Sequence, residues 1–381
     1  MLRLAATLAA TLAATLALCA TTVALAAAPV NGAGHAAAVA RSGAADTTAA
    51  ETTAADTSAH ETVADATAAP VEPSASATPS QPWRLVRTTF VNRAPDTPVA
   101  EPSGVLVDTF GRVWMSDAAL HGLQRFETSG AALDQTGALG SEPGQFRRPG
   151  ALARVGALGV AVLDVENRRV TVYDHHLRLL GAAIDLAAPA LEARVGRVSP
   201  VGLTADRGGA LYVADAERDR ILVFDYAGTF QRELGGFGAR AGGFSGLLAV
   251  AAGAHGGLVT VERPRGRSKR AVAPDTTVGR SRVQWLDAGG RVVESVWLPA
   301  WSAGAGETGL ALAVDDSGVV AIVAERSGEL VVLSSDGAVV ARDKGLAAPR
   351  AVAFGAAGEL LVAAAGEARL LRFTLVPPAA E

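Results

Sequence analysis

The chain has 381 residues, and its 34 Lys and Arg against 38 Asp and Glu give a formal net charge of -4. Residues 1–82 hold two Arg and six of the acids, which leaves 32 basic and 32 acidic residues in 83–381. A neutral domain has no global field that would attract nucleic acid or another polyanion, so any such attraction must come from a local patch.

Residues 1–26 are expected to be a signal peptide, because a short basic start precedes an apolar run of Ala, Leu and Thr. Ala24 and Ala26 supply the small residues that favour cleavage. The only cysteine, Cys19, is an alternative lipid-attachment site, although Leu18 before it is larger than such motifs prefer, and an uncleaved anchor is a third alternative. We therefore expect an exported protein that is periplasmic, displayed at the cell surface or secreted.

Residues 27–82 are expected to be a disordered linker, because they are rich in Ala, Thr, Ser and Pro and poor in larger aliphatic residues. We assign a folded domain to 83–376 and a short tail to 377–381. No second apolar run approaches the ~18 residues that a membrane span needs.

An internal repeat dominates the domain. In the first copy, Gly104 to Asp108 and Val113 to Asp117 read as two strands with a glycine turn between them. The same pattern returns from Gly202, and further copies begin at Ala151, Leu247, Leu312 and Ala351. Short apolar strands punctuated by glycine predict antiparallel sheets that repeat radially, and no helical period is sustained in 83–381. We predict an all-β fold, a six-bladed β-propeller with four-stranded blades.

The two ends of the repeat predict how the ring closes. The sixth copy ends soon after Phe373 and provides only three strands, whereas Leu85 to Val91 is a strand pattern without a blade. We expect this N-terminal strand to pair with the last one, which would complete the sixth blade and remove an exposed edge.

Several segments resemble the NHL repeat. They are Tyr212-Val213-Ala214-Asp215, Arg220-Ile221, Phe224-Asp225, Gly228, and the loops Gly140 to Pro149 and Gly235 to Phe244. The similarity covers about 100–375 and implies a six-bladed propeller. It also implies two known uses of such domains, since some NHL propellers are metal-dependent lyases with converging histidines and others bind RNA through a basic face.

Acids end the second strand of four repeats, and arginines begin the third strand of four. The acids are Asp117, Asp164, Asp215 and Glu262, and the arginines are Arg169, Arg220, Arg282 and Arg369. Such rings could hold a cation or an anion. However, Asp164–Arg169 and Asp215–Arg220 flank hairpin turns of equal length. We favour exposed pairs that close these turns, each worth about 0–1 kcal/mol.

Histidines would be needed for a metal site of the lyase kind, and the domain holds four of them, His121, His175, His176 and His255. We expect His121 on the opposite face from the other three, so the four cannot converge on one metal. A near absence of Asn argues against a calcium-dependent lactonase, and no Gly-x-Ser-x-Gly nucleophile motif is present. We therefore expect no cofactor, no metal and no catalytic residue.

The turn between Glu262 and Arg282 contains a long insertion, in which 263–280 holds six basic residues and one acid. We expect it on the face that carries the blade-to-blade connections. The candidate partner-binding residues are Arg147, Arg148, Arg240, Arg263, Arg265, Arg267, Lys269, Arg270 and Arg280. Such a cluster fits an anionic polymer or protein surface, and a solvated loop is the alternative. Export and the lack of aromatic residues in the basic run argue against nucleic acid.

Two functions remain open at this point. The leading hypothesis is a monomeric, non-catalytic binding or scaffold module whose partner is an unknown protein or an anionic polymer. The alternative is an extracytoplasmic lyase or hydrolase at the mouth of the central channel. The fold alone cannot decide between them, because propellers of one architecture have many functions.

Overall fold

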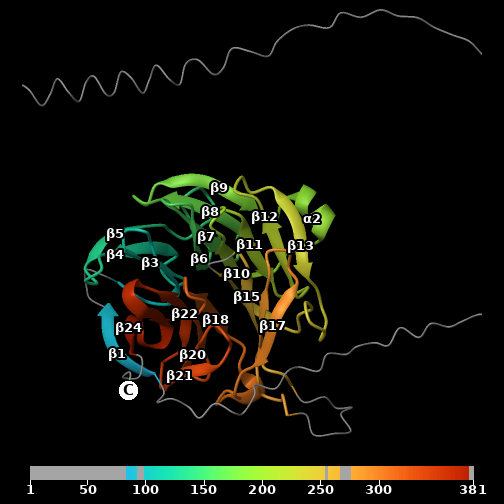
Figure 1. Cartoon of the computed structure of the whole chain (residues 1–381). Coiled ribbons are helices and arrows are strands. Elements are labelled where there is room, and N and C mark those ends of the chain that lie inside the picture. Colours follow the sequence, from blue (N-terminus) through green and yellow to red (C-terminus); the bar gives the residue numbers. More distant parts are fainter. Residues whose placement is uncertain (1–82, 92–97, 254–255, 267–275, 377–381) are drawn as a thin grey trace, which may run out of the picture. The chain divides into compact units, whose positions relative to one another are not determined.

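The computed structural model describes residues 83–91, 98–253, 256–266 and 276–376. The predicted signal peptide with Cys19, the predicted linker and the tail lie outside these residues. The described chain forms six separate sheets of four antiparallel strands in a ring, which confirms the predicted six-bladed β-propeller (Figure 1). None of its helices is long and apolar enough to cross a membrane.

The blades are numbered in chain order, and each is described from its innermost strand outward. Blade 1 consists of β2 (Pro102–Val107), β3 (Val113–Asp117), β4 (Gly122–Phe126) and β5 (Ala132–Thr136). Blade 2 consists of β6 (Pro149–Val155), β7 (Gly159–Asp164), β8 (Arg169–Asp174) and β9 (Leu179–Asp185). Blade 3 consists of β10 (Pro200–Ala205), β11 (Leu211–Asp215), β12 (Arg220–Phe224) and β13 (Phe230–Gly235).

The second half of the ring repeats this order. Blade 4 consists of β14 (Leu247–Ala252), β15 (Leu258–Glu262), β16 (Arg282–Leu286) and β17 (Val292–Trp297). Blade 5 consists of β18 (Leu310–Val314), β19 (Val320–Ala324), β20 (Glu329–Leu333) and β21 (Val339–Lys344). Blade 6 consists of β22 (Pro349–Phe354), β23 (Glu359–Ala364), β24 (Arg369–Val376) and β1 (Arg84–Val91).

The N-terminal strand closes the ring as predicted. β1 pairs antiparallel with β24, from Arg84 opposite Val376 to Val91 opposite Leu370. In Figure 1 the blue β1 arrow lies beside the red β24. Since the outer edge of β24 would otherwise expose unpaired backbone N–H and C=O groups, this pairing protects an edge that could aggregate.

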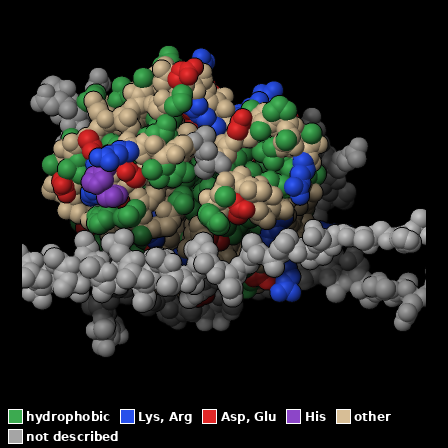
Figure 2. All heavy atoms as spheres, turned by 90° about the horizontal axis from the view of Figure 1, so that it is seen from above, with side chains coloured by type: hydrophobic (Ala, Val, Ile, Leu, Met, Phe, Trp, Pro, Cys, Tyr) green, Lys and Arg blue, Asp and Glu red, His purple; other side chains and the backbone are tan. Residues whose placement is uncertain are grey.

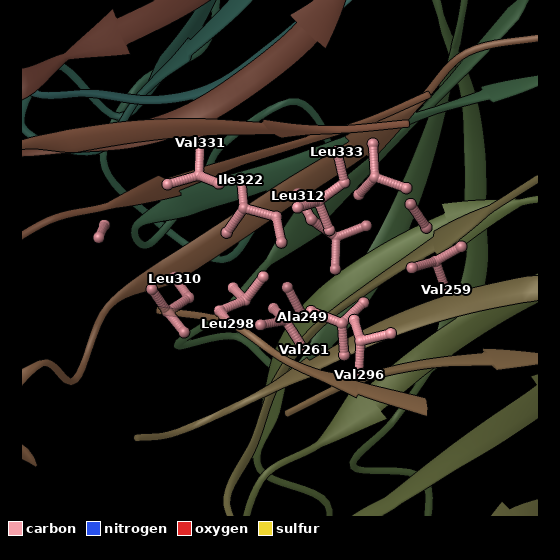
Figure 3. Close-up of a cluster of buried hydrophobic side chains, with 14 of the residues drawn as sticks. Ala249, Val259, Val261, Val296, Leu298, Leu310, Leu312, Ile322, Val331 and Leu333 are labelled. Carbon is pink, nitrogen blue, oxygen red and sulfur yellow. The ribbon is translucent and has the colours of Figure 1, made fainter. Parts of the chain in front are cut away.

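The hydrophobic core lies between the blades. The innermost strands contact one another around the whole ring, and six buried clusters each fill the space between two neighbouring blades. Figure 3 shows the cluster between blades 4 and 5, where Val261 and Val296 face Leu312 and Ile322. The blades approach closely at Gly104, where an added Cβ would lie 2.3 Å from the carbonyl oxygen of Gly150.

One short helix corrects the expectation that the domain contains none. Helix α2 (Pro189–Val195) lies in the connection between blades 2 and 3 and ends at Gly196, whose φ is +72°. Val195 is buried in the core between these blades. Seven residues make about two helical turns, which is too short for a 3.6-residue period to stand out in the sequence. The described residues also contain three 3-10 turns, at Gly304–Gly306, Ala356–Gly358 and Ala365–Glu367.

Candidate binding site between blades 3 and 4

The acid–arginine pairs close their hairpin turns, but they are buried and not exposed as expected. Nε of Arg169 lies 3.0 Å from Asp164, Nε of Arg220 lies 2.9 Å from Asp215, and Nε of Arg282 lies 2.7 Å from Glu262. All three carboxylates are buried. The remaining members of the two rings differ, since Asp117 accepts backbone N–H groups and Arg369 pairs with Glu367.

These arginines also hold the connections that join the blades. Arg169 donates to the carbonyls of Ser141 and Gln145, and Arg220 donates to the carbonyl of Val195. Arg282 donates to the carbonyls of Ala239 at 2.8 Å and Gly243 at 2.7 Å. Because these guanidinium donors face backbone and carboxylate groups, the three arginines are structural anchors and do not form an anion site.

A pocket of about 460 Å³ lies next to the Glu262–Arg282 pair, between blades 3 and 4. The connection after β13 and the turn after β15 supply most of its wall, and β17 supplies Trp297; these strands are labelled in Figure 1. The side chains that form the wall include Phe237, Arg263, Arg265 and Trp297, and Asp219, Glu262 and Arg282 also line the pocket.

Phe237 is the most exposed large apolar side chain among the described residues, at 84%. Its loop is nevertheless well defined, because the N–H of Gly238 donates to the carbonyl of Phe244 and the N–H of Phe244 donates to the carbonyl of Gly236, both at 2.9 Å. Gly235 adopts a φ of +80°, and a Cβ there would lie 2.1 Å from the buried Phe244 ring. The loop therefore fixes the backbone that carries this exposed aromatic side chain at the pocket.

The two carboxylates of the pocket accept hydrogen bonds from groups within the fold. Oδ1 of Asp219 accepts the N–H groups of Gly246 and Leu247, at 2.9 and 2.7 Å. Glu262 accepts from Arg282, Gln284 and the Ser245 N–H. Burial raises the pKa of Glu262, and these hydrogen bonds oppose the shift. Both carboxylates therefore serve the fold as hydrogen-bond acceptors.

Arg263 and Arg265 supply positive charge at the rim of the pocket. Arg263 is exposed and lies over Gly246, where an added Cβ would meet the arginine Cβ at 2.9 Å. The Arg265 guanidinium lies 5.9 Å from the centre of the Trp297 ring. Trp297 presents a buried indole N–H that has no hydrogen-bond partner among the described residues. The pocket thus combines cations and aromatic rings.

The structure brings together only some of the candidate basic residues. Arg263 and Arg265 line the pocket, and Arg240 is exposed in the same connection as Phe237. Arg280 does not face the pocket with free donors, because it donates to the carbonyls of Trp297 and Leu298. Arg147 and Arg148 lie in the connection between blades 1 and 2 and do not line it. Arg267, Lys269 and Arg270 lie outside the described residues.

Sequence reasoning missed the two aromatic residues of the pocket. Phe237 and Trp297 lie far from the basic run in sequence, and only the folding of blade 4 brings them to it. A usable signal was Phe237 between glycines, since an apolar side chain in a loop of Gly has no core to join.

The described histidines occupy two turns of the propeller. His121 lies between β3 and β4, and its Nδ1 accepts the N–H of Arg148 at 3.4 Å. His175 and His176 lie between β8 and β9 with ring centres 4.0 Å apart, and histidine side chains gather at one point of the surface in Figure 2. His255 lies outside the described residues. In the part of the chain that the structure describes, no group of three or more His, Cys, Asp or Glu could hold a metal.

The central channel forms a second cavity, of about 560 Å³, lined by the innermost strands of all six blades. Its charged lining residues are Arg154, Asp206 and Arg207. Asp206 accepts the Tyr212 hydroxyl at 2.9 Å, and Arg207 pairs with Asp316 at 2.8 Å. Arg207 and Asp316 belong to the inner turns of blades 3 and 5, so the pair links two blades that are not neighbours.

Comparison with known proteins identifies the fold and no family. No protein-family profile matches the chain, and no curated protein matches its sequence. A streptogramin B lyase structure is 14% identical, with 76% of this chain and 98% of that chain covered and a TM-score of 0.51. A gluconolactonase from Xanthomonas campestris is 14% identical, with 78% and 95% covered and a TM-score of 0.52. At such identities the likeness shows the six-bladed propeller alone, and the NHL resemblance stays a prediction.

Proposed function

We propose that this protein is a binding module that takes an anionic ligand in the pocket between blades 3 and 4. The observation that carries the proposal is the exposed Phe237 ring, which lines the same pocket as Arg263 and Arg265. The volume of about 460 Å³ falls in the range of roughly 300–1,000 Å³ that is usual for small-molecule sites. Arginine suits oxyanions because its planar guanidinium can donate two parallel hydrogen bonds. The apolar start of the chain supports work outside the cytoplasm.

The test removes equal charge at two places on one face of the propeller. The double variant Arg263→Ala/Arg265→Ala is compared with Arg147→Ala/Arg148→Ala, which lies in the connection between blades 1 and 2. On a sulfated-polymer column at low salt, we expect the first variant to elute well before the parent and the second to elute close to it. The difference should vanish in about 1 M salt, where the Debye length is roughly 3 Å. Equal retention of the two variants, with unchanged melting temperatures, would refute the pocket as the binding site.

A second candidate function is a lyase or hydrolase reaction at the central channel. The channel cavity favours it, because Arg154 and Asp206 place a cation and a carboxylate in one cavity. The likeness to a streptogramin B lyase and a gluconolactonase suggests the substrates to test. Turnover of streptogramin B or gluconolactone that is lost in Arg154→Ala, and kept in Arg263→Ala/Arg265→Ala, would support this function. Turnover by neither parent nor variants would count against it.

A further inference from the structure

Six equivalent positions, one from each blade, surround one end of the central channel. In each blade the position is the residue of the innermost strand that pairs with the first buried residue of the second strand. We call these positions the channel ring, and all six line the cavity of about 560 Å³. In blade order they are Val107, Arg154, Ala205, Ala252, Val314 and Phe354. Five are apolar and one is arginine, so blade 2 departs from the pattern of the other five.

Arg154 also differs from the other charged residues of the cavity wall. Asp206 accepts the Tyr212 hydroxyl at 2.9 Å, and Arg207 forms an ion pair with Asp316 at 2.8 Å. Arg154 is exposed, and its side chain forms no hydrogen bond or ion pair with the other described residues. The guanidinium of Arg154 is therefore the charged group of this wall that the described part of the fold does not use.

The cavity opens to solvent at the channel ring, because the exposed turn residues Thr109 and Ala157 also line it. Further along the axis the wall is formed by the innermost strands, several of which are labelled in Figure 1. Each of them is the last strand of its sheet and pairs on one side only. Their unpaired backbone N–H and C=O groups need water or another polar partner. An apolar group is therefore better placed against the side chains of the channel ring than deeper in the channel.

We infer that this end of the channel binds a small carboxylic acid with an apolar body, with the carboxylate at Arg154 and the body against the apolar members of the channel ring. A guanidinium matches a carboxylate because it donates two parallel hydrogen bonds. One arginine near the acids Asp206 and Asp316 suits a ligand with a single negative charge. A short fatty acid and a small aromatic acid share this chemistry. The site is separate from the pocket between blades 3 and 4, and it requires no turnover in the channel.

The experiment varies the ligand and the arginine separately. Calorimetry measures binding of octanoate, 3-phenylpropionate, acetate and octan-1-ol to the full chain. Acetate keeps the charge without the apolar body, and octan-1-ol keeps the body without the charge. The titrations are repeated with Arg154→Met and with the control Arg178→Met, which changes an exposed arginine in the β8–β9 turn of the same blade that does not line the cavity. Since both arginines are exposed, both variants should keep the melting temperature of the parent within about 2 °C.

We expect octanoate or 3-phenylpropionate to bind the parent and Arg178→Met equally. Arg154→Met should bind the same acid about tenfold to a hundredfold more weakly, because hydrogen bonds to a charged group are lost. Acetate should bind the parent at least about a hundredfold more weakly than octanoate, since each buried CH₂ group is worth about fourfold in affinity. Binding of octanoate alone supports an aliphatic acid as the ligand, and binding of 3-phenylpropionate alone supports an aromatic acid.

Four results would overturn the inference. They are binding of neither acid, equal octanoate binding by Arg154→Met and the parent, acetate binding as tight as that of octanoate, and octan-1-ol binding as tight as that of octanoate. Arg263→Ala/Arg265→Ala should bind octanoate as the parent does, and a loss of binding in that variant would show that the acid occupies the other pocket. Failure at Arg154 is thus distinguishable from failure of the proposed function, which the sulfated-polymer column tests.

Discussion

Replacing Arg282 by Met should destabilise the propeller strongly and in a pH-dependent way. Arg282 donates two hydrogen bonds to Glu262, at 2.7 and 3.0 Å, and two to the carbonyls of Ala239 and Gly243. Met fills much of the same volume but leaves the buried carboxylate without its cation. Removing one partner of a buried ion pair typically costs about 3–5 kcal/mol of the free energy of unfolding. At roughly 2–4 °C per kcal/mol for a domain of this size, we expect a melting temperature about 10 °C lower.

The pH dependence follows from the direction of the Glu262 pKa. Burial already raises the pKa of this carboxyl in the folded protein, and loss of Arg282 removes a group that lowers it. A folded-state pKa above the unfolded value adds stability below the unfolded pKa, near 4.3, and this stability is lost as pH rises through the folded pKa. The gap in melting temperature between parent and variant should therefore be wider at pH 8 than at pH 5.

Two further variants make the prediction refutable. Glu262→Gln/Arg282→Met leaves no buried charge, so it should recover part of the lost stability, with a smaller dependence of the gap on pH. Arg291→Met is the control in the same blade, because its ion pair with Asp287 is exposed, and we expect a change of about 1 °C or less. Differential scanning calorimetry at both pH values measures the gaps. An Arg282→Met gap under about 2 °C, or one that does not change with pH, would show that the carboxylate is not isolated as argued.

Other predictions concern ring closure, the Phe237 loop and two tyrosines. A chain that begins at residue 98 lacks β1, so we expect its melting transition to broaden and fall by roughly 10 °C or more relative to one that begins at 83, and equal transitions would refute closure. Gly235→Ala should cost about 1–3 kcal/mol in denaturant unfolding, because its Cβ meets a ring at 2.1 Å, whereas Gly266→Ala, in open space, should be neutral. Burial raises the pKa of Tyr173 and of Tyr212 to about 12, so absorbance at 295 nm should show two phenols titrating near pH 12, and stability should fall as pH rises from about 10 to 12.

The fold was largely readable from the sequence because propeller blades repeat a local pattern. Short apolar strands and glycine turns located the blades, and the unpaired strand pattern at Leu85 to Val91 located the closure. The burial of the Asp215–Arg220 pair could not be predicted from the sequence. Sequence spacing fixes which side chains meet across a hairpin, whereas burial depends on a blade connection folding over the pair, through contacts such as Arg220 with the carbonyl of Val195.

Only part of the candidate site could be predicted from the sequence, for a related reason. Charge clusters are local in sequence, so Arg263 and Arg265 could be found by counting. Phe237 and Trp297 join them only because one belongs to the connection into blade 4 and the other ends the outermost strand of that blade. The order of the strands within a blade brings them together. This order can be read from the sequence only after the copies of the repeat have been aligned.

The buried Glu262–Arg282 pair, which lines the pocket, explains how blade 4 can carry a long turn without losing its structure. The same acid–arginine pair joins residues 5 apart in blade 3 and 20 apart in blade 4. In both blades the arginine reaches a carbonyl of the preceding connection, so the blade edge is fixed below the turn whatever its length. Residues beyond the Glu262–Arg282 pair can therefore change without disturbing the sheet. The arrangement separates the scaffold, which the buried pair holds, from the rim, where Arg263 and Arg265 line the pocket.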